Sequence, residues 1–145
     1  MGCDIHACLE RKFDDGWHMI TLIRGYEGGR GGERDYAFFS SLCGVRKGFD
    51  DDSIYPQPKG LPNDVSVVTE WYSNGWDCDG HSHSWETATE FVKKKLVLDR
   101  LRDSKNELKS QDYESYQILG YSIDDGIAEE VDNTNLYRVV FWFDN

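Results

Sequence analysis

The sequence predicts an α+β fold, in which a small mixed or antiparallel sheet packs with two or three helices and long irregular loops. Three observations lead there: an alternating segment with a turn signal at the amino end, a strongly apolar segment at the carboxyl end, and helix-start signals between them. The chain has 145 residues, the size of one domain, so we expect a single domain over residues 1–145.

The amino end predicts a β-hairpin. Residues 3–10 alternate between apolar and polar side chains, which indicates a half-buried strand. Asp15-Gly16 suits a tight turn with positive φ, and residues 17–23 continue as a second apolar strand. Residues 26–33 contain four glycines but lack the strand-then-helix setting of a phosphate-binding loop, so we expect a surface loop there.

The middle of the chain predicts short helices separated by a long connection. Residues 36–43 have helical spacing of apolar side chains, with Gly44 as the stop, and this helix should pack on the hairpin. Residues 47–63 hold all three prolines and read as an irregular connection. After it, Asn63 or Asp64 is expected to cap a short helix that runs through Trp71.

The last third predicts one long helix and one central strand. Residues 87–90 have the spacing of a capping box, so a helix should begin there and run through Leu101, which leaves His81 and His83 in a loop that enters it. A charged stretch that is helical or partly mobile is expected over residues 103–114. Residues 136–143 are apolar except for Arg138, as in a strand buried on both faces.

The net charge of −11 disfavours binding to nucleic acid or to an anionic membrane. Two interpretations of it stay open: a solubilising surface, which the even spread of acids favours, or an acidic face that competes with nucleic acid for a basic partner. No apolar run approaches the ~18 residues of a membrane span, and the amino end lacks the pattern of a signal peptide. We therefore expect a cytoplasmic protein whose four cysteines are mostly reduced thiols.

Possible metal ligands concentrate in residues 77–85, and one more histidine lies near the amino end. Imidazole and thiolate suit zinc, and in extended chain two residues that are two positions apart share a side. We therefore predict a metal site in which a divalent transition metal, above all zinc, is bound by Asp4, His6, His81 and His83.

Two alternatives to that ligand set stay open, besides a ligand pocket that holds no metal. Two C-x-x-H pairs would give a closed site of Cys3, His6, Cys78 and His81, but it requires distortion because Cys3 and His6 otherwise point to opposite faces of a strand. In the other, the histidines only hydrogen-bond to backbone and neighbouring serines and so fix an irregular loop.

Several blocks scattered over nearly the whole chain resemble a family of small uncharacterised proteins encoded by bacteriophages and in bacterial genomes that carry phage genes. They are Met1 to His6, Arg34-Asp35-Tyr36 leading to Gly44-Val45-Arg46, Gly60 to Ser66, His81 to Trp85, and Arg138 to Asn145. The resemblance implies a phage-type protein that acts in the cytoplasm of a bacterial host, and it brings no established activity with it.

Three classes of function remain open. An enzyme would be a metal-dependent hydrolase of phosphoesters or nucleotides, with Asp77 or Asp79 as general base. A binding protein would sequester a small phosphorylated ligand, such as a nucleotide signal in host defence. An interaction protein would use its acidic surface to block a host factor. The residues expected to hold a phosphorylated ligand are Arg34, Arg46, Lys59 and Arg138, with the faces of Trp76 and Trp85. For the arginines, pairing with nearby acids is the alternative.

Overall fold

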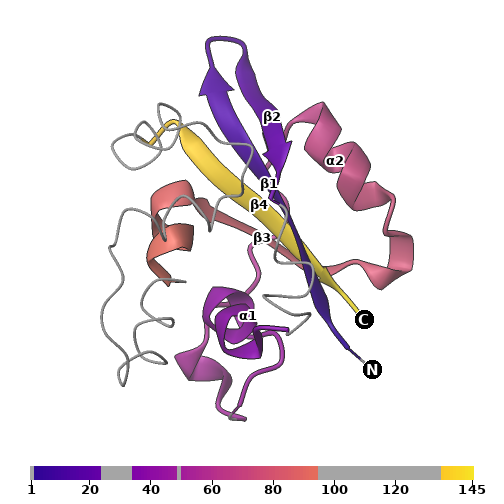
Figure 1. Ribbon diagram of the computed structural model, residues 1–145, viewed down its shortest axis with the longest axis vertical. Coiled ribbons are helices and arrows are strands. Elements are labelled where there is room, and N and C mark those ends of the chain that lie inside the picture. Colours follow the sequence, from indigo (N-terminus) through magenta and orange to yellow (C-terminus); the bar gives the residue numbers. More distant parts are fainter. Residues whose placement is uncertain (1, 24–33, 49, 95–134) are drawn as a thin grey trace.

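The computed structural model describes residues 2–23, 34–48, 50–94 and 135–145, and its centre is a four-stranded antiparallel sheet in the order β2-β1-β4-β3 (Figure 1). The strands are β1 (Asp4–Phe13), β2 (Gly16–Leu22), β3 (His81–Thr87) and β4 (Tyr137–Asp144). The helices are α1 (Tyr36–Cys43), α2 (Val67–Asn74) and a helix over residues 88–94, with short 3-10 turns η1 (Asp52–Ile54) and η2 (Asp77–Asp79). The predicted α+β class is confirmed, and the sheet is antiparallel rather than mixed.

The amino-terminal hairpin is confirmed. β1 and β2 pair from Cys8 opposite Leu22 to Phe13 opposite Gly16. Gly16 has φ +122°, a conformation that side chains rarely adopt, so the Asp-Gly turn signal has a direct structural reason.

The predicted central strand is also confirmed. β4 pairs with β1 on one side and with β3 on the other, and every residue of β4 except Asp144 is buried. Helices cover both faces of the sheet, and for this reason β4 is apolar on both of its sides.

The larger core lies on the face that α1 covers (Figure 1). Phe38, Phe39 and Leu42 of α1 pack there as the sequence predicted, with Phe91 of the helix over residues 88–94 beside them. The sheet contributes Ile5, Ala7, Leu9, Val139, Phe141 and Phe143. α2 lies on the opposite side of the sheet and covers the other set of alternating residues (Figure 1).

The histidine segment was predicted as a loop, and this prediction is wrong, because residues 81–87 form β3 at the edge of the sheet. A central apolar strand needs a neighbour on each side, and β3 supplies the second neighbour of β4. The pairing is irregular between His81 and Ser84, where Ser82 has φ +53°. The local sequence does not indicate this long-range pairing, because residues 81–84 contain no large apolar side chain.

Of the two other predicted helix caps, one lies at a different residue and the other is confirmed. Ser66, not Asn63 or Asp64, caps α2, since its hydroxyl accepts a hydrogen bond from the Thr69 backbone N–H at 3.2 Å. The Thr87 cap is confirmed by the bond from Glu90 N–H to Thr87 Oγ1 at 3.2 Å. The predicted continuation to residue 101, the stretch 103–114 and the loop 26–33 lie outside the described residues. Among the described residues, no helix has the length and apolar character needed to cross a membrane.

Candidate functional site

Two of the predicted histidines lie on either side of a buried tryptophan. His6 of β1 is the register partner of Trp142 on β4, with ring centroids 6.0 Å apart, and the His83 ring of β3 lies 6.1 Å from Trp142 on its other side. Trp76, in the turn after α2, stacks on His6 at 3.9 Å. We call Trp76, His6, Trp142 and His83 the aromatic row.

Hydrogen bonds fix one end of the aromatic row. His6 Nε2 lies 3.1 Å from Asp144 Oδ2, and the other carboxylate oxygen of Asp144 accepts the Asp4 backbone N–H at 3.2 Å. Burial lowers the pKa of His83, and the nearby His81 lowers it further, so the neutral ring is favoured. The Trp142 indole N–H is buried and has no hydrogen-bond acceptor among the described residues. The row is therefore a packing element that joins three strands.

The predicted metal ligands do not converge on one point. β4 separates β1 from β3, so His6 and His83 stand two strand spacings apart, about 10 Å, whereas ligands of one ion each lie ~2 Å from it. Asp4 forms a two-pronged pair with Arg34, at 2.7 and 3.0 Å, and this pair lowers the pKa of the Asp4 carboxyl. In the ranges that the structure describes, no three His, Cys, Asp or Glu side chains lie together as a metal site would require.

His81, the fourth predicted ligand, belongs to a different neighbourhood. It is opposite Phe143 in the β3–β4 register, one position beyond Trp142, and its ring stacks on Phe143 with centroids 6.3 Å apart. Its Nδ1 lies 3.0 Å from Ser82 Oγ, as the hydrogen-bonding alternative expected. Its Nε2 is buried without a partner among the described residues.

The alternative set of two C-x-x-H pairs is not brought together either. Cys3 is buried in the core on the α1 face, while His6 points to the opposite face, as the alternation of an undistorted strand requires. Cys78 is exposed in η2, and all four cysteines are free thiols. Asp77 and Asp79, the predicted general bases, are likewise exposed in η2, between α2 and β3.

Each cation predicted to hold a phosphate contacts another part of the protein. Arg34 pairs with Asp4, and the Arg46 guanidinium lies 5.6 Å from the centre of the Tyr36 ring. Lys59 Nζ donates to the Trp85 carbonyl at 2.9 Å and lies 4.5 Å from the centre of the Trp85 ring. Of the predicted aromatic faces, Trp76 contacts His6 and stays 36% exposed, and Trp85 contacts Lys59.

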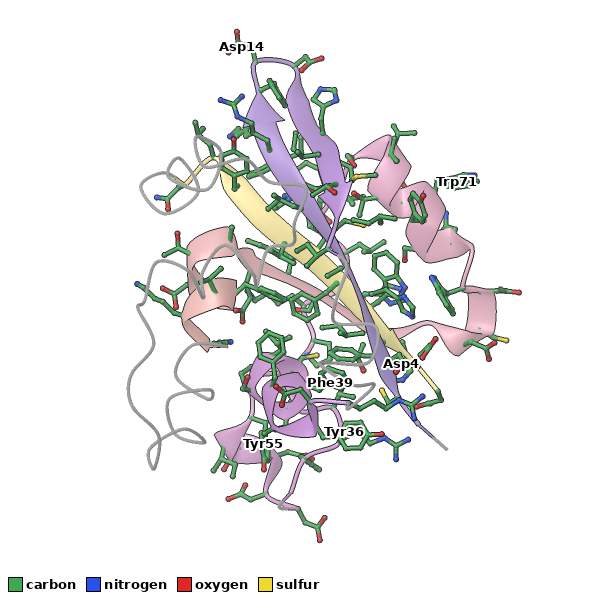
Figure 2. All side chains as sticks on the ribbon, viewed as in Figure 1. Asp4, Asp14, Tyr36, Phe39, Tyr55 and Trp71 are labelled. Atoms are coloured by element: carbon green, nitrogen blue, oxygen red, sulfur yellow. The ribbon has the colours of Figure 1, made fainter. Side chains whose placement is uncertain are left out.

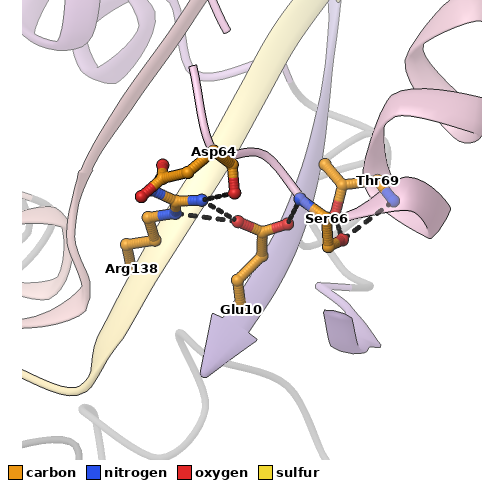
Figure 3. A network of polar contacts seen from close by, with 5 residues as sticks. All are labelled: Glu10, Asp64, Ser66, Thr69 and Arg138. Atoms are coloured by element: carbon orange, nitrogen blue, oxygen red, sulfur yellow. Dashed lines mark hydrogen bonds and ion pairs between the residues drawn. The ribbon is translucent and has the colours of Figure 1, made fainter. Parts of the chain in front are cut away.

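Arg138 lies in a buried network that the sequence did not reveal (Figure 3). Its guanidinium donates to Glu10 Oε1 at 2.8 Å and to Asp64 Oδ1 at 2.7 Å, and it lies 4.0 Å from the centre of the Trp17 ring. The second oxygen of Glu10 accepts the Ser66 backbone N–H at 3.0 Å. The network therefore ties the amino end of α2 to β1, β2 and β4.

The outward face of α2 is the feature that sequence reasoning missed. Val67, Val68 and Trp71 are 83%, 47% and 70% exposed, and Trp71 projects away from the sheet (Figure 2). The residues that α2 buries are Thr69 and Ser73, both small and polar. This arrangement reverses the usual amphipathic helix, which turns its large apolar side chains toward the core.

The charged residues of the segment that contains α2 all have the same sign. Residues 60–80 contain no lysine, arginine or histidine, and their four acidic residues are all exposed: Asp64, Glu70, Asp77 and Asp79. The sequence shows this local charge bias. It does not show that this face is outward, because Val67, Val68 and Trp71 share one side of a helix, a pattern that ordinarily predicts a side facing the core.

No protein-family model matches the chain, and no curated protein and no solved structure is significantly similar to it.

Proposed function

We propose that the protein acts by binding another protein through the outward face of α2. The observation that carries the proposal is the 70% exposure of Trp71, on a helix whose inward residues are Thr69 and Ser73. Val67 and Val68 are one turn away from Trp71 on the helix surface, so the three form a continuous apolar surface. Contiguous exposed apolar surface marks interaction sites, and tryptophan is prominent among the residues that dominate binding energy.

The anchoring of α2 supports the same proposal. Ser66 caps the helix and is itself bonded to the buried Glu10, and Thr69 is fully buried beside Cys8. A helix held at its first turn presents its outward side chains in a fixed arrangement. Less conformational entropy is then lost on binding.

The two small-ligand hypotheses have less support. A phosphorylated ligand would have to compete with Asp4 for Arg34, and with Glu10 and Asp64 for the buried Arg138. The metal-dependent hydrolase stays a prediction, and the metal content of protein purified without a histidine tag tests it directly.

The interaction proposal agrees with the third class of function, an acidic protein that blocks a host factor. The resemblance to phage-type proteins and the cytoplasmic location stay predictions. They direct the search for the partner to bacterial proteins.

Capture from a bacterial lysate on immobilised protein, followed by quantitative mass spectrometry, tests the proposal. The comparison is between Trp71→Ser and Ile54→Ser, because Ile54 is 59% exposed but lies in η1, away from α2. We expect a protein that the wild type and Ile54→Ser retain equally and that Trp71→Ser retains about tenfold less. Equal retention by both variants would contradict the proposal.

A further inference from the structure

We infer, on the basis of the proposed function, that the partner is a basic protein segment, with an apolar side chain that packs on Val67 and Trp71 and with lysine or arginine side chains that pair with the surrounding carboxylates. The carboxylates border the apolar surface along the chain. Asp64 precedes α2, Glu70 lies within it, and Asp77 and Asp79 follow it in η2.

Charge complementarity favours a basic segment as the partner of this face. The acidic residues around the face have no basic neighbour in residues 60–80, and the whole chain carries −11. Arg138 contacts two carboxylates, Glu10 and Asp64, and therefore neutralises only one of the two negative charges. Opposite charges across an interface accelerate association and fix its register, whereas like charges oppose it.

The same charges argue against a second copy of this chain as the occupant. Two copies joined through this face would bring the same exposed carboxylates together, at Glu70 and in η2. Each copy also carries the full −11. Electrostatic repulsion therefore opposes self-association through α2.

Trp71 suits a cationic partner in a second way. The face of an indole ring attracts a guanidinium or ammonium group. Two contacts of this kind already exist within the protein: Arg138 lies 4.0 Å from the centre of the Trp17 ring, and Lys59 lies 4.5 Å from that of Trp85. At Trp71, 70% exposed, a cation of the partner would take the corresponding place.

Two synthetic amphipathic helical peptides with the same leucine stripe test the inference. One carries lysine at every polar position and the other glutamate. Binding of each fluorescently labelled peptide is followed by anisotropy over a range of salt concentrations. We expect the lysine peptide to bind at least about tenfold more tightly than the glutamate peptide, with an affinity that falls as salt screens the carboxylates.

Matched variants locate the binding site. Glu70→Gln and Asp14→Asn each remove one exposed carboxylate, the first from α2 and the second from the tip of the β1–β2 hairpin, outside α2 (Figure 2). Trp71→Ser and Ile54→Ser each remove one exposed apolar side chain. Affinity for the lysine peptide should fall several-fold in Glu70→Gln and about tenfold in Trp71→Ser, and should stay unchanged in the other two.

Three results would overturn the inference: no binding of the lysine peptide, equal binding of the two peptides, or equal loss in Glu70→Gln and Asp14→Asn. Each leaves the proposed function standing if lysate capture still depends on Trp71. Loss of that dependence would remove the proposed function itself. The two failures are therefore distinguishable.

Discussion

Glu10 and Arg138 face each other as register partners on β1 and β4, and both side chains are buried, with Arg138 Nε 2.8 Å from Glu10 Oε1. Each charge is satisfied by the other and by the segment that leads into α2 (Figure 3). The pair thus connects the centre of the sheet to the helix that carries the proposed binding face.

Breaking this pair should destabilise the fold strongly. Glu10→Gln leaves Arg138 with a buried charge that only Asp64 still offsets, and we expect the free energy of unfolding to fall by about 3–5 kcal/mol. Urea denaturation measures this loss. The double variant Glu10→Leu with Arg138→Met removes both charges and should recover most of it. If the free energy of unfolding of Glu10→Gln lies within ~0.5 kcal/mol of the wild-type value, the buried pair does not stabilise the fold as described.

Only one of the four thiols should react in the folded protein. Cys78 is exposed, while burial raises the pKa of Cys8 and of Cys43 to about 12 and also raises the pKa of Cys3. Since the thiolate is the reactive form, a thiol reagent at about pH 8 should modify Cys78 quickly and the other three only after unfolding. Cys78→Ser serves as the control and should abolish the fast reaction. Fast reaction of a second thiol would contradict the burial of β1 and α1.

His83 should make stability fall on mild acidification. Burial holds the pKa of His83 below its usual 6.5, so the unfolded chain binds a proton at a higher pH than the folded protein does. The contribution of His83 to the free energy of unfolding is therefore fully present above pH 6.5 and is lost as the pH falls toward the lowered pKa. We expect a shallower decline between about pH 7.5 and 5.5 in His83→Gln. His6 and His18 are present in both proteins and cancel in the comparison, whereas His81 interacts with His83 and is part of the difference. Identical slopes would contradict the prediction.

Three strands (β1, β2 and β4) and α1 were predictable because their signals are local. The alternation before the Asp-Gly turn, the apolar run that ends in β4 and the Gly44 stop each depend on neighbouring residues. β3 was missed because its stability comes from pairing with a strand more than fifty residues later in the chain. The local sequence of this segment indicated only the helix cap at Thr87.

The candidate site was predicted less well for a related reason. The proposed ligand set assumed that Asp4 with His6 and His81 with His83 would meet, but the strand order places Trp142 between the two pairs. Arg34 and Arg138 were predicted to hold a phosphorylated ligand, with pairing to acids as the alternative, and in the structure each of them pairs with an acid. The outward turn of Trp71 was not predictable, because the helical spacing of Val67, Val68 and Trp71 is that of a side facing the core, whereas α2 buries Thr69 and Ser73.

Site-specific photo-crosslinking tests the central claim most directly, because it records what touches the face of α2 at the moment of binding. A photoreactive phenylalanine analogue replaces Val67, which is 83% exposed, and in a matched protein it replaces Ile54 of η1, which is 59% exposed. Irradiation in bacterial lysate should give a discrete adduct from position 67 that is absent from position 54 and is weakened by high salt. No adduct from position 67, or the same adducts from both positions, would contradict the account.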